Sequence, residues 1–543
     1  MNDTSAPPTL WQRSTTSRFL RWLFSWRTAR RALMALLALV TLVAFGYGVE
    51  NWRGRRVWHQ FKTEHEARGE RLDLKAFVPP PVPDEQNLAM TPLLKPLHTF
   101  VLDEKRKQHR LPPNSPQPLL PISIHFKSGS RMKEPANGSL DNGILVDLAA
   151  WQEFYRGNTN YPQPAQPQSP ALDVLTALSK YDAAFQELHA AAATRPLCRF
   201  NVPYDDDCPF AILLPHLAAM KGLALTTALR ANARVAAGQT DAALTEMRLG
   251  LRLAEGVKPE PILISYLVRL AMLHITFQPA AEGLARHAWT DAQLAELDKL
   301  LGSVDLLSDY QLAMRGERGF GAATVDWLKR ASAREAAGLM GDESSDFQFA
   351  SELAFRFIPD GWLDQNKVNM GRMFDQYSLP AVDAKARRIH PDLAGGVESS
   401  PDVRSFAPYK FMARLLMPAL SKVALRTARQ QTLLDQLRIA CALERHRLAK
   451  GAYPATLDVL VPRYLAAVPN DLIAGEPLKY QKTGETYQIY AVGWNQQDDG
   501  GKPAFLSRLL RTDSTRGDWV WRPPSDWPTG DPKEEAKSKT KLL

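Results

Sequence analysis

The chain has 543 residues, 45% of them hydrophobic, and a formal net charge of +9. This composition is ordinary for a folded protein, and the length is sufficient for about two to four domains. Residues 1–31 hold six arginines against one aspartate, and the smaller remaining excess is spread over the rest of the chain. That distribution excludes the concentrated basic surface that nucleic-acid binding requires, so no nucleic-acid partner is expected.

An uncharged run from Ala32 to Val49 is the first predicted element. A helix crosses the bilayer core with about 18 to 20 mostly apolar residues, so residues 32–49 predict a transmembrane helix. The basic leader, residues 1–31, precedes it, and basic residues stay on the cytoplasmic side. We therefore expect one membrane anchor in a bacterial inner membrane, with a cytoplasmic N-terminus and a periplasmic body. The alternatives are a cleaved signal peptide, although Phe45–Glu50 is a poor cleavage site, and a buried core helix.

Residues 50–170 are predicted to contain a charged juxtamembrane helix and then several proline-rich segments. Three consecutive prolines, Pro79–Pro81, impose an extended and semi-rigid backbone. Proline recurs over residues 111–121 and 161–170. We expect this part of the chain to act as a spacer with a few short elements.

Residues 171–410 are predicted to form a helical domain, because apolar residues recur every three or four positions between glycine and proline breaks. Leu213–Leu253 is typical of a helix pair, in which Gly238 ends the first helix and Thr240 caps the second. Residues 290–293 and 308–311 match the capping-box pattern at the start of a helix. Ile262–Phe277 contains Arg269, which is costly in lipid, so we expect a buried helix there and no second span.

Two of the three cysteines flank a short loop, Cys198 to Cys208. In an oxidising envelope compartment this pair is predicted to form a disulfide. The alternative is two unrelated thiols in a reduced protein. Cys441 lies on an apolar helical stripe and is expected to be buried without a disulfide partner.

Residues 411–521 are predicted to form a small α+β domain. Ser421–Lys450 has a helical pattern whose apolar stripe includes Leu433, Leu437, Cys441 and Leu448, and Gly451 suits a left-handed cap. Alternating residues on both sides of Gly484 predict a hairpin over Leu478–Val492. Asp518–Trp521 is expected to add a strand, and residues 522–543 to form a disordered tail.

This last domain resembles the globular domain of the type II secretion major pseudopilin. The resemblance is carried by the order of a long helix, a Tyr-Pro turn, a small helix, a hairpin and an acidic glycine loop. The matching segments are Gly451–Leu457, Leu460–Pro462, Val468–Asp471, Gly475–Tyr480, Tyr487–Tyr490 and Asp498–Gly501. The rest of the chain resembles uncharacterised single-anchor bacterial envelope proteins.

The chain departs from the pseudopilin pattern before this domain. Pseudopilins carry a processing signal and an apolar helix directly before the globular part, whereas here Arg414, Pro418 and Lys422 interrupt the preceding stretch. The predicted anchor lies far upstream. The resemblance therefore implies a fixed membrane protein that carries a pseudopilin-like domain, and not a subunit that polymerises.

The acidic loop binds calcium in the pseudopilin family. The positions that match are Asp498 and Asp499, with Asp513 or Asp518 contributing later, so the resemblance implies a calcium site at Asp498, Asp499 and Asp518. Calcium takes six to eight oxygen ligands, which carboxylates and the carbonyls of a glycine-rich loop supply. A solvated Asp-Asp-Gly-Gly turn is the alternative. No other cofactor is expected.

The sequence contains no G-x-S-x-G, Walker or H-E-x-x-H motif. We therefore expect a mainly α protein with an N-terminal transmembrane helix, a helical middle domain and a small C-terminal α+β domain. The expected function is that of a membrane-anchored extracytoplasmic scaffold or protein-interaction protein, which has an unidentified protein partner and is not an enzyme. The alternatives are an envelope enzyme whose site is assembled from distant residues, and an accessory subunit of a secretion or pilus system.

Overall fold

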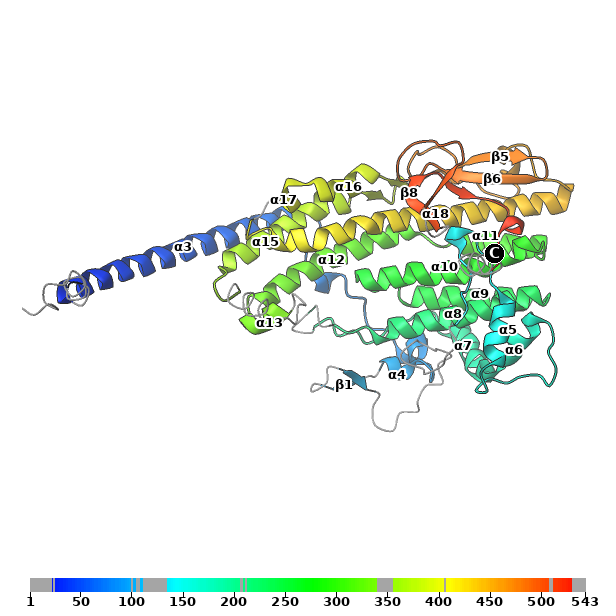
Figure 1. The fold of residues 1–543 in the computed structure, drawn as a ribbon, viewed down its shortest axis with the longest axis horizontal. Coiled ribbons are helices and arrows are strands. Elements are labelled where there is room, and N and C mark those ends of the chain that lie inside the picture. The colour runs from blue at the N-terminus through cyan, green and yellow to red at the C-terminus, as the bar shows by residue number, and fades with distance from the viewer. Residues whose placement is uncertain are drawn as a thin grey trace, which may run out of the picture. The chain divides into compact units, whose positions relative to one another are not determined.

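The computed structural model describes residues 22, 25–98, 101–103, 108–110, 134–205, 209, 212–338, 355–404, 407–506 and 511–529. Its contacts divide the chain into two compact units, residues 1–70 with 328–368, and residues 71–327 with 369–543. The predicted fold class is confirmed, because the structure is mainly helical, with a long apolar N-terminal helix and small antiparallel sheets near the C-terminus (Figure 1). Most of the predicted segments 171–410 and 411–521 lie together in the second unit.

The first unit begins with α3 (Trp26–Ala67), which joins the predicted transmembrane and juxtamembrane helices into one. The Oγ of Ser25 accepts a hydrogen bond from the amide of Thr28 and caps its N-terminus. The apolar half of α3 is not buried, and Leu39 and Phe45 are exposed. Within the described residues, α3 is the one helix that is long and apolar enough to cross a membrane, which fits a single-pass anchor.

The polar half of α3 packs against α15 (Asp360–Met373) at two glycines. A Cβ on Gly54 would lie 2.2 Å from the carbonyl oxygen of Gly361, and a Cβ on Gly361 would lie 1.9 Å from that of Glu50. The Glu50 carboxylate accepts hydrogen bonds from Trp362 Nε1 at 3.1 Å and from Gln365 Nε2 at 3.2 Å. The segment that follows the predicted span is therefore fixed to the folded part of this unit. The unit also contains α13 (Ala333–Gly338).

The second unit is built on long helices that run side by side (Figure 1). α8 and α9 form a hairpin, and α10 packs on both. The helices are α4 (Lys95–His98), α5 (Leu148–Arg156), α6 (Pro170–Leu178), α7 (Asp182–Thr194), α8 (Pro215–Ala236), α9 (Thr240–Gly256), α10 (Leu263–Ala285), α11 (Asp291–Gly302), α12 (Leu306–Leu328), α16 (Pro391–Ser399), α17 (Pro401–Arg404) and α18 (Phe411–Lys450). A π-helical turn, η7 (Phe374–Ser378), follows α15.

Short elements connect these helices. The 3-10 turns are η1 (Leu74–Ala76), η2 (Asp84–Gln86), η3 (Leu88–Met90), η4 (Leu140–Asn142), η5 (Ser179–Tyr181), η8 (Leu457–Leu460) and η9 (Pro524–Asp526). Two small antiparallel pairs join β1 (Val101–Asp103) to β2 (Gln108–Arg110) and β3 (Val382–Asp383) to β4 (Arg388–Ile389).

The helix boundaries confirm some of the predicted caps and correct others. Gly238 follows α8 with φ of 76°, as predicted. Thr240 does not cap α9, because the helix begins at that residue and its Oγ1 instead accepts a hydrogen bond from Gln293. The capping box of Thr290 and Gln293 is present at α11. Ser308 does not cap α12, since Asp305 Oδ1 accepts from the amides of residues 307 and 308.

The prediction that Ile262–Phe277 is a buried helix is confirmed by α10. Arg269 is 1% exposed and its Nη1 lies 2.6 Å from Asp309 Oδ2 on α12. A buried arginine with a carboxylate partner belongs to the core of a folded unit and not to a lipid-facing span.

The C-terminal sheet covers one side of α18 (Figure 1). Strands β5 (Lys479–Thr483) and β6 (Thr486–Ala491) form the predicted hairpin around Gly484, and β9 (Trp519–Trp521) pairs with β6. Leu433, Leu437 and Cys441 are buried beneath it, as predicted. Leu448, the last residue of the stripe, is 45% exposed, because the last residues of α18 are mostly uncovered.

A second antiparallel pair, β7 (Pro503–Leu506) and β8 (Arg511–Gly517), was not predicted. Residues 522–529, the start of the predicted disordered tail, instead pack on the second unit. The Leu145 amide donates to the carbonyl of Pro528 at 2.8 Å, and Trp527 contacts the ring of Trp521. Residues 530–543 lie outside the described part of the chain.

Candidate functional site: a basic pocket between α10 and α18

A cavity of about 690 Å³ lies between α10 and α18 in the second unit. This volume is within the range of small-molecule sites, which is about 300 to 1,000 Å³. We call this cavity the basic pocket. Its lining residues are Asp141, Lys221, Leu267, Leu270, Ala271, His274, Ile275, Lys422, Leu425, Arg426, Arg429, Gln430, Ser514 and Thr515.

The helical repeat explains why these side chains meet. On α10, lining residues recur from Leu267 through Leu270 to His274, and on α18 from Lys422 through Arg426 to Arg429. Residues three or four apart lie on the same face of a helix, so each helix presents one continuous strip to the cavity. Lys221 of α8, Asp141 of η4 and two residues of β8 complete the wall.

The wall combines apolar side chains with an excess of positive charge. Five aliphatic residues line it, together with four lysine or arginine side chains and one carboxylate, that of Asp141. Lys221, Lys422 and Arg426 are exposed, whereas Arg429 is 8% exposed. The basic pocket therefore attracts anions, and its aliphatic wall favours a ligand with an apolar part.

Arg429 is the most buried cation of the basic pocket. Its Nη2 donates to the backbone oxygen of Asp141 at 3.1 Å, and its Nε lies 3.9 Å from Asp141 Oδ1. Its Nη1 has no hydrogen-bond partner among the described residues. Burial lowers the pKa of the Arg429 guanidinium, and the charge of Asp141 opposes this effect. Arginine remains protonated in proteins, so the group is an incompletely neutralised buried cation.

His274 and Gln430 add polar groups beside Arg429. His274 Nδ1 lies 3.3 Å from Gln430 Oε1 and 3.7 Å from Asp141 Oδ2. The Nε2 of Gln430 has no acceptor among the described residues. The amide is therefore a second buried donor that remains unsatisfied in this wall.

The arrangement suits binding better than bond cleavage. Nucleophilic catalysis needs a nucleophile within hydrogen-bond reach of a base. Among the described residues, no hydrogen bond joins His274 to the Ser514 or Thr515 hydroxyl, and Thr515 Oγ1 lies 2.7 Å from Asp513 Oδ1. The chemistry available in the basic pocket is charge and hydrogen-bond donation beside an apolar wall.

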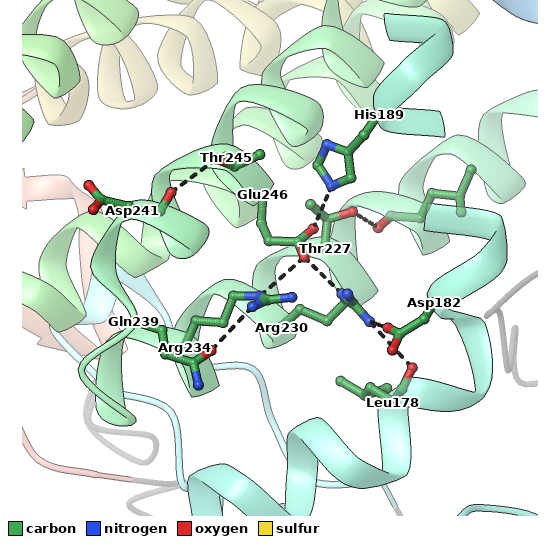
Figure 2. A network of polar contacts seen from close by, with 11 residues as sticks. Leu178, Asp182, His189, Thr227, Arg230, Arg234, Gln239, Asp241, Thr245 and Glu246 are labelled. Carbon is green, nitrogen blue, oxygen red and sulfur yellow. Dashed lines mark hydrogen bonds and ion pairs between the residues drawn. The ribbon is translucent and has the colours of Figure 1, made fainter. Parts of the chain in front are cut away.

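A buried polar network between α6, α7, α8 and α9 has a different role (Figure 2). Glu246 of α9, which is 2% exposed, accepts hydrogen bonds from Arg230 Nε at 2.9 Å and from Arg234 Nε at 3.3 Å. Arg230 also donates to Asp182 at 2.8 Å, and His189 Nε2 lies 3.3 Å from Glu246. Every charge in the network has a partner, so it fastens α7 to the α8–α9 hairpin and leaves no group for a ligand.

Burial raises the pKa of Glu246, but the hydrogen bonds from His189 and Arg230 and the charge of Arg230 hold it below its ordinary value. The carboxylate is therefore ionised at neutral pH. It acts as the fixed negative centre of the network.

Ser265, Glu260 and His216 form a second buried chain of polar groups. The Ser265 hydroxyl donates to Glu260 Oε2, and Glu260 Oε1 lies 2.7 Å from His216 Nε2. In a catalytic triad the serine bonds to the imidazole, whereas here it bonds to the carboxylate. The order of the groups therefore differs from that of a Ser–His–Asp triad, and the chain of bonds ties the start of α8 to α10.

The predicted calcium ligands lie around one loop, each with its own partner. Asp498 pairs with Lys479, and Asn495 Nδ2 donates to Asp499 at 3.0 Å. Asp518 is buried and accepts from the amide of Asp499 at 3.2 Å and from that of Gly501 at 2.7 Å. Three ligand atoms of these residues do not lie within 4.8 Å of one another in the described structure. The calcium site stays a prediction.

The predicted disulfide joins Cys198 to Cys208. Cys198 is buried, and Cys208 lies outside the described residues, so the disulfide stays a prediction. Cys441 is buried in α18 as expected. Burial raises the pKa of its thiol well above the usual range, which makes it unreactive.

Sequence reasoning missed the basic pocket. The sequence pattern marks Lys422 only as an interruption of an apolar stretch, and it does not single out Arg426 or Arg429. A signal is present, because these three bases recur at a spacing of three to four on a helix that is otherwise largely buried. The aliphatic partners on α10 and Asp141 are far away in the sequence and carry no comparable signal.

No family model, curated protein or solved structure matches this chain.

Proposed function

We propose that this protein is a single-pass protein of the bacterial inner membrane whose periplasmic body is a scaffold that binds a protein partner. The observation that carries the proposal is α3. Its apolar half is unburied, and its polar half is fixed to α15 at Gly54 and Gly361. The folded part of the first unit is joined to the predicted anchor by one continuous helix, which supports a protein held at the membrane.

The orientation is supported by the arginines of residues 1–31, which precede the span. Protease added to spheroplasts is expected to degrade the body and to spare only a short N-terminal fragment. Protection of the full chain would reverse the orientation. Lysed spheroplasts serve as the control, because there the cytoplasmic leader is cleaved as well.

The resemblance of residues 411–521 to a pseudopilin domain supports that domain as the partner-binding part. Leu448 and Val459 are exposed apolar residues within it, 45% and 52% exposed respectively. A photo-crosslinking amino acid at either position is expected to capture a discrete protein in intact cells. The same amino acid at exposed Thr245 of α9 is the matched control. Absence of a crosslinked species at both C-terminal positions would contradict the proposal.

The same resemblance favours one second candidate, an accessory subunit of a secretion or pilus system. The crosslinking experiment separates the two, because a pilin or secretion component as the captured protein identifies an accessory subunit. Any other discrete partner identifies a scaffold of a different assembly.

A further inference from the structure

We propose that the basic pocket binds an anionic amphiphile, a small molecule with a phosphate or carboxylate head and a hydrocarbon tail. This inference does not depend on the scaffold proposal. It concerns a cavity that lies in the second unit, between α10 and α18.

The first argument is the incomplete pairing of Arg429. The same unit contains Arg230, a buried arginine with carboxylate partners at 2.8 and 2.9 Å. Arg429 has one backbone oxygen at 3.1 Å, a carboxylate 3.9 Å away and the ring of Trp519 at 5.7 Å from its guanidinium carbon, and its Nη1 has no hydrogen-bond partner among the described residues. Because a buried cation without full pairing is costly, an anionic oxygen beside Arg429 is strongly favoured.

The second argument is the number of further cations around the same cavity. Lys221, Lys422 and Arg426 line it, and no ion pair of these residues is found within the described part of the chain. A phosphate or carboxylate head carries several acceptor oxygens, which suits a cluster of lysine and arginine donors. The single acidic residue of the wall, Asp141, does not balance these charges.

The third argument is the aliphatic wall. Leu267, Leu270, Ile275 and Leu425 line the cavity beside the cations. A bare inorganic anion would leave this apolar surface in contact with water, whereas a hydrocarbon tail would remove it from water. The two kinds of wall therefore specify a ligand with two parts.

The test uses the full-length protein in discs of phosphatidylcholine, with dodecyl phosphate as the probe below its micelle concentration. Calorimetry is expected to show saturable binding of dodecyl phosphate, and at least about tenfold weaker binding of inorganic phosphate or of dodecanol. Equal affinity for inorganic phosphate would overturn the requirement for a tail. Equal affinity for dodecanol would overturn the requirement for an anion.

The variant Lys422→Gln with Arg426→Gln removes two exposed cations and is expected to weaken dodecyl phosphate binding at least about tenfold. The matched control is Lys299→Gln with Lys450→Gln, which removes the same charge outside the pocket and is expected to leave the affinity unchanged. Equal effects of the two double variants would overturn the site. Arg429→Gln should abolish binding, but it also removes a buried charge and can affect folding. The test of the site therefore relies on the variant of the two exposed residues, Lys422 and Arg426.

Two sources offer the same chemistry, a membrane lipid and a free amphiphile. Adding phosphatidic acid to the discs distinguishes them. If phosphatidic acid competes with dodecyl phosphate, the ligand is a lipid of the bilayer. If phosphatidic acid does not compete, the ligand is a free amphiphile. A protein with no measurable binding of dodecyl phosphate would refute the inference and leave the scaffold proposal intact, because crosslinking to a protein partner does not use the pocket.

Discussion

At the scale of single residues, buried charges in the second unit differ in how completely they are paired. Glu246 has three basic partners, and Asp435 of α18 has Arg387 as its ion-pair partner at 2.9 Å. Arg429 has a backbone oxygen at 3.1 Å, but its nearest carboxylate oxygen lies 3.9 Å away. Full pairing identifies groups that hold helices together, and incomplete pairing identifies a group that remains open to a ligand.

Replacing Glu246 with Ala is expected to lower the free energy of unfolding by about 3 to 5 kcal/mol, because Arg230 stays buried without its main partner. The control is Glu296→Ala, which breaks an ion pair of the same 2.9 Å length with Arg248. Both of those side chains are substantially exposed. The expected cost is about 0 to 1 kcal/mol. Denaturant unfolding in a nonionic detergent measures both, and equal losses would contradict the structural role of the network.

The buried carboxyl group of Asp435 is expected to make the free energy of unfolding depend on pH. Burial raises its pKa to about 6, with Arg387 and Arg438 opposing. The folded state therefore holds this proton at a pH where the unfolded state has lost it, so the contribution of Asp435 to stability falls as the pH rises from about 4 to 6. The expected fall is on the order of 3 kcal/mol. Unfolding measured at several pH values should show this fall in the wild type relative to Asp435→Asn, and parallel curves would contradict it.

At the scale of elements, α18 is the central helix of the second unit. It contacts α10, α11 and α16 and carries the C-terminal sheet. Its own sequence supplies both the buried stripe below the sheet and the basic strip of the pocket. One helix thus links the predicted domain to the candidate site.

Replacing Leu437 tests the packing of the core around α18. It is fully buried, so Leu437→Ala is expected to cost about 2 to 5 kcal/mol through the cavity that it leaves. Leu448→Ala on the same helix is the control and should cost less than about 1 kcal/mol, since Leu448 is 45% exposed. Similar losses for both variants would show that the sheet does not cover α18 as described.

The acidic loop, Asp498–Gly501, is predicted to bind calcium. If the pseudopilin calcium site is present, calcium raises the melting temperature of the wild type. Asp498→Asn with Asp499→Asn is expected to remove this shift, because calcium binds carboxylate oxygens. Magnesium serves as the control ion. A wild-type melting temperature that is insensitive to calcium would leave the loop as a solvated turn.

At the scale of the whole molecule, the apolar half of α3 decides where the protein is located. Replacing Leu36, Leu39 and Val43 with Arg is expected to cost about 2.5 to 3.5 kcal/mol for each residue in the bilayer, which is enough to prevent insertion. Carbonate-washed membranes should then lack the chain. Gln60→Arg in the polar half of α3 is the control and should leave the chain in the membrane. Retention of the triple variant would contradict a transmembrane anchor.

Features that depend on local pattern can be predicted from the sequence alone. The uncharged run Ala32–Val49, the apolar stripe of α18 with its Gly451 cap, and the hairpin around Gly484 are all readable, because helical and strand periodicity are properties of neighbouring residues. Local pattern was also insufficient at some ends. Asp305, and not Ser308, caps α12. The apolar stripe of α18 continues to Leu448, where the helix is no longer covered.

The tertiary structure alone decided which distant residues meet. The approach of Gly54 to Gly361, the pairing of Arg230 with Glu246, and the convergence of Asp141 and Lys221 on the basic strip of α18 join segments that share no local pattern. A lysine or arginine on a helix has the same appearance in the sequence whether water or a cavity faces it. Only the packing of α10 against α18 places aliphatic and cationic side chains around one volume, and that packing makes Arg429 a candidate ligand-binding group.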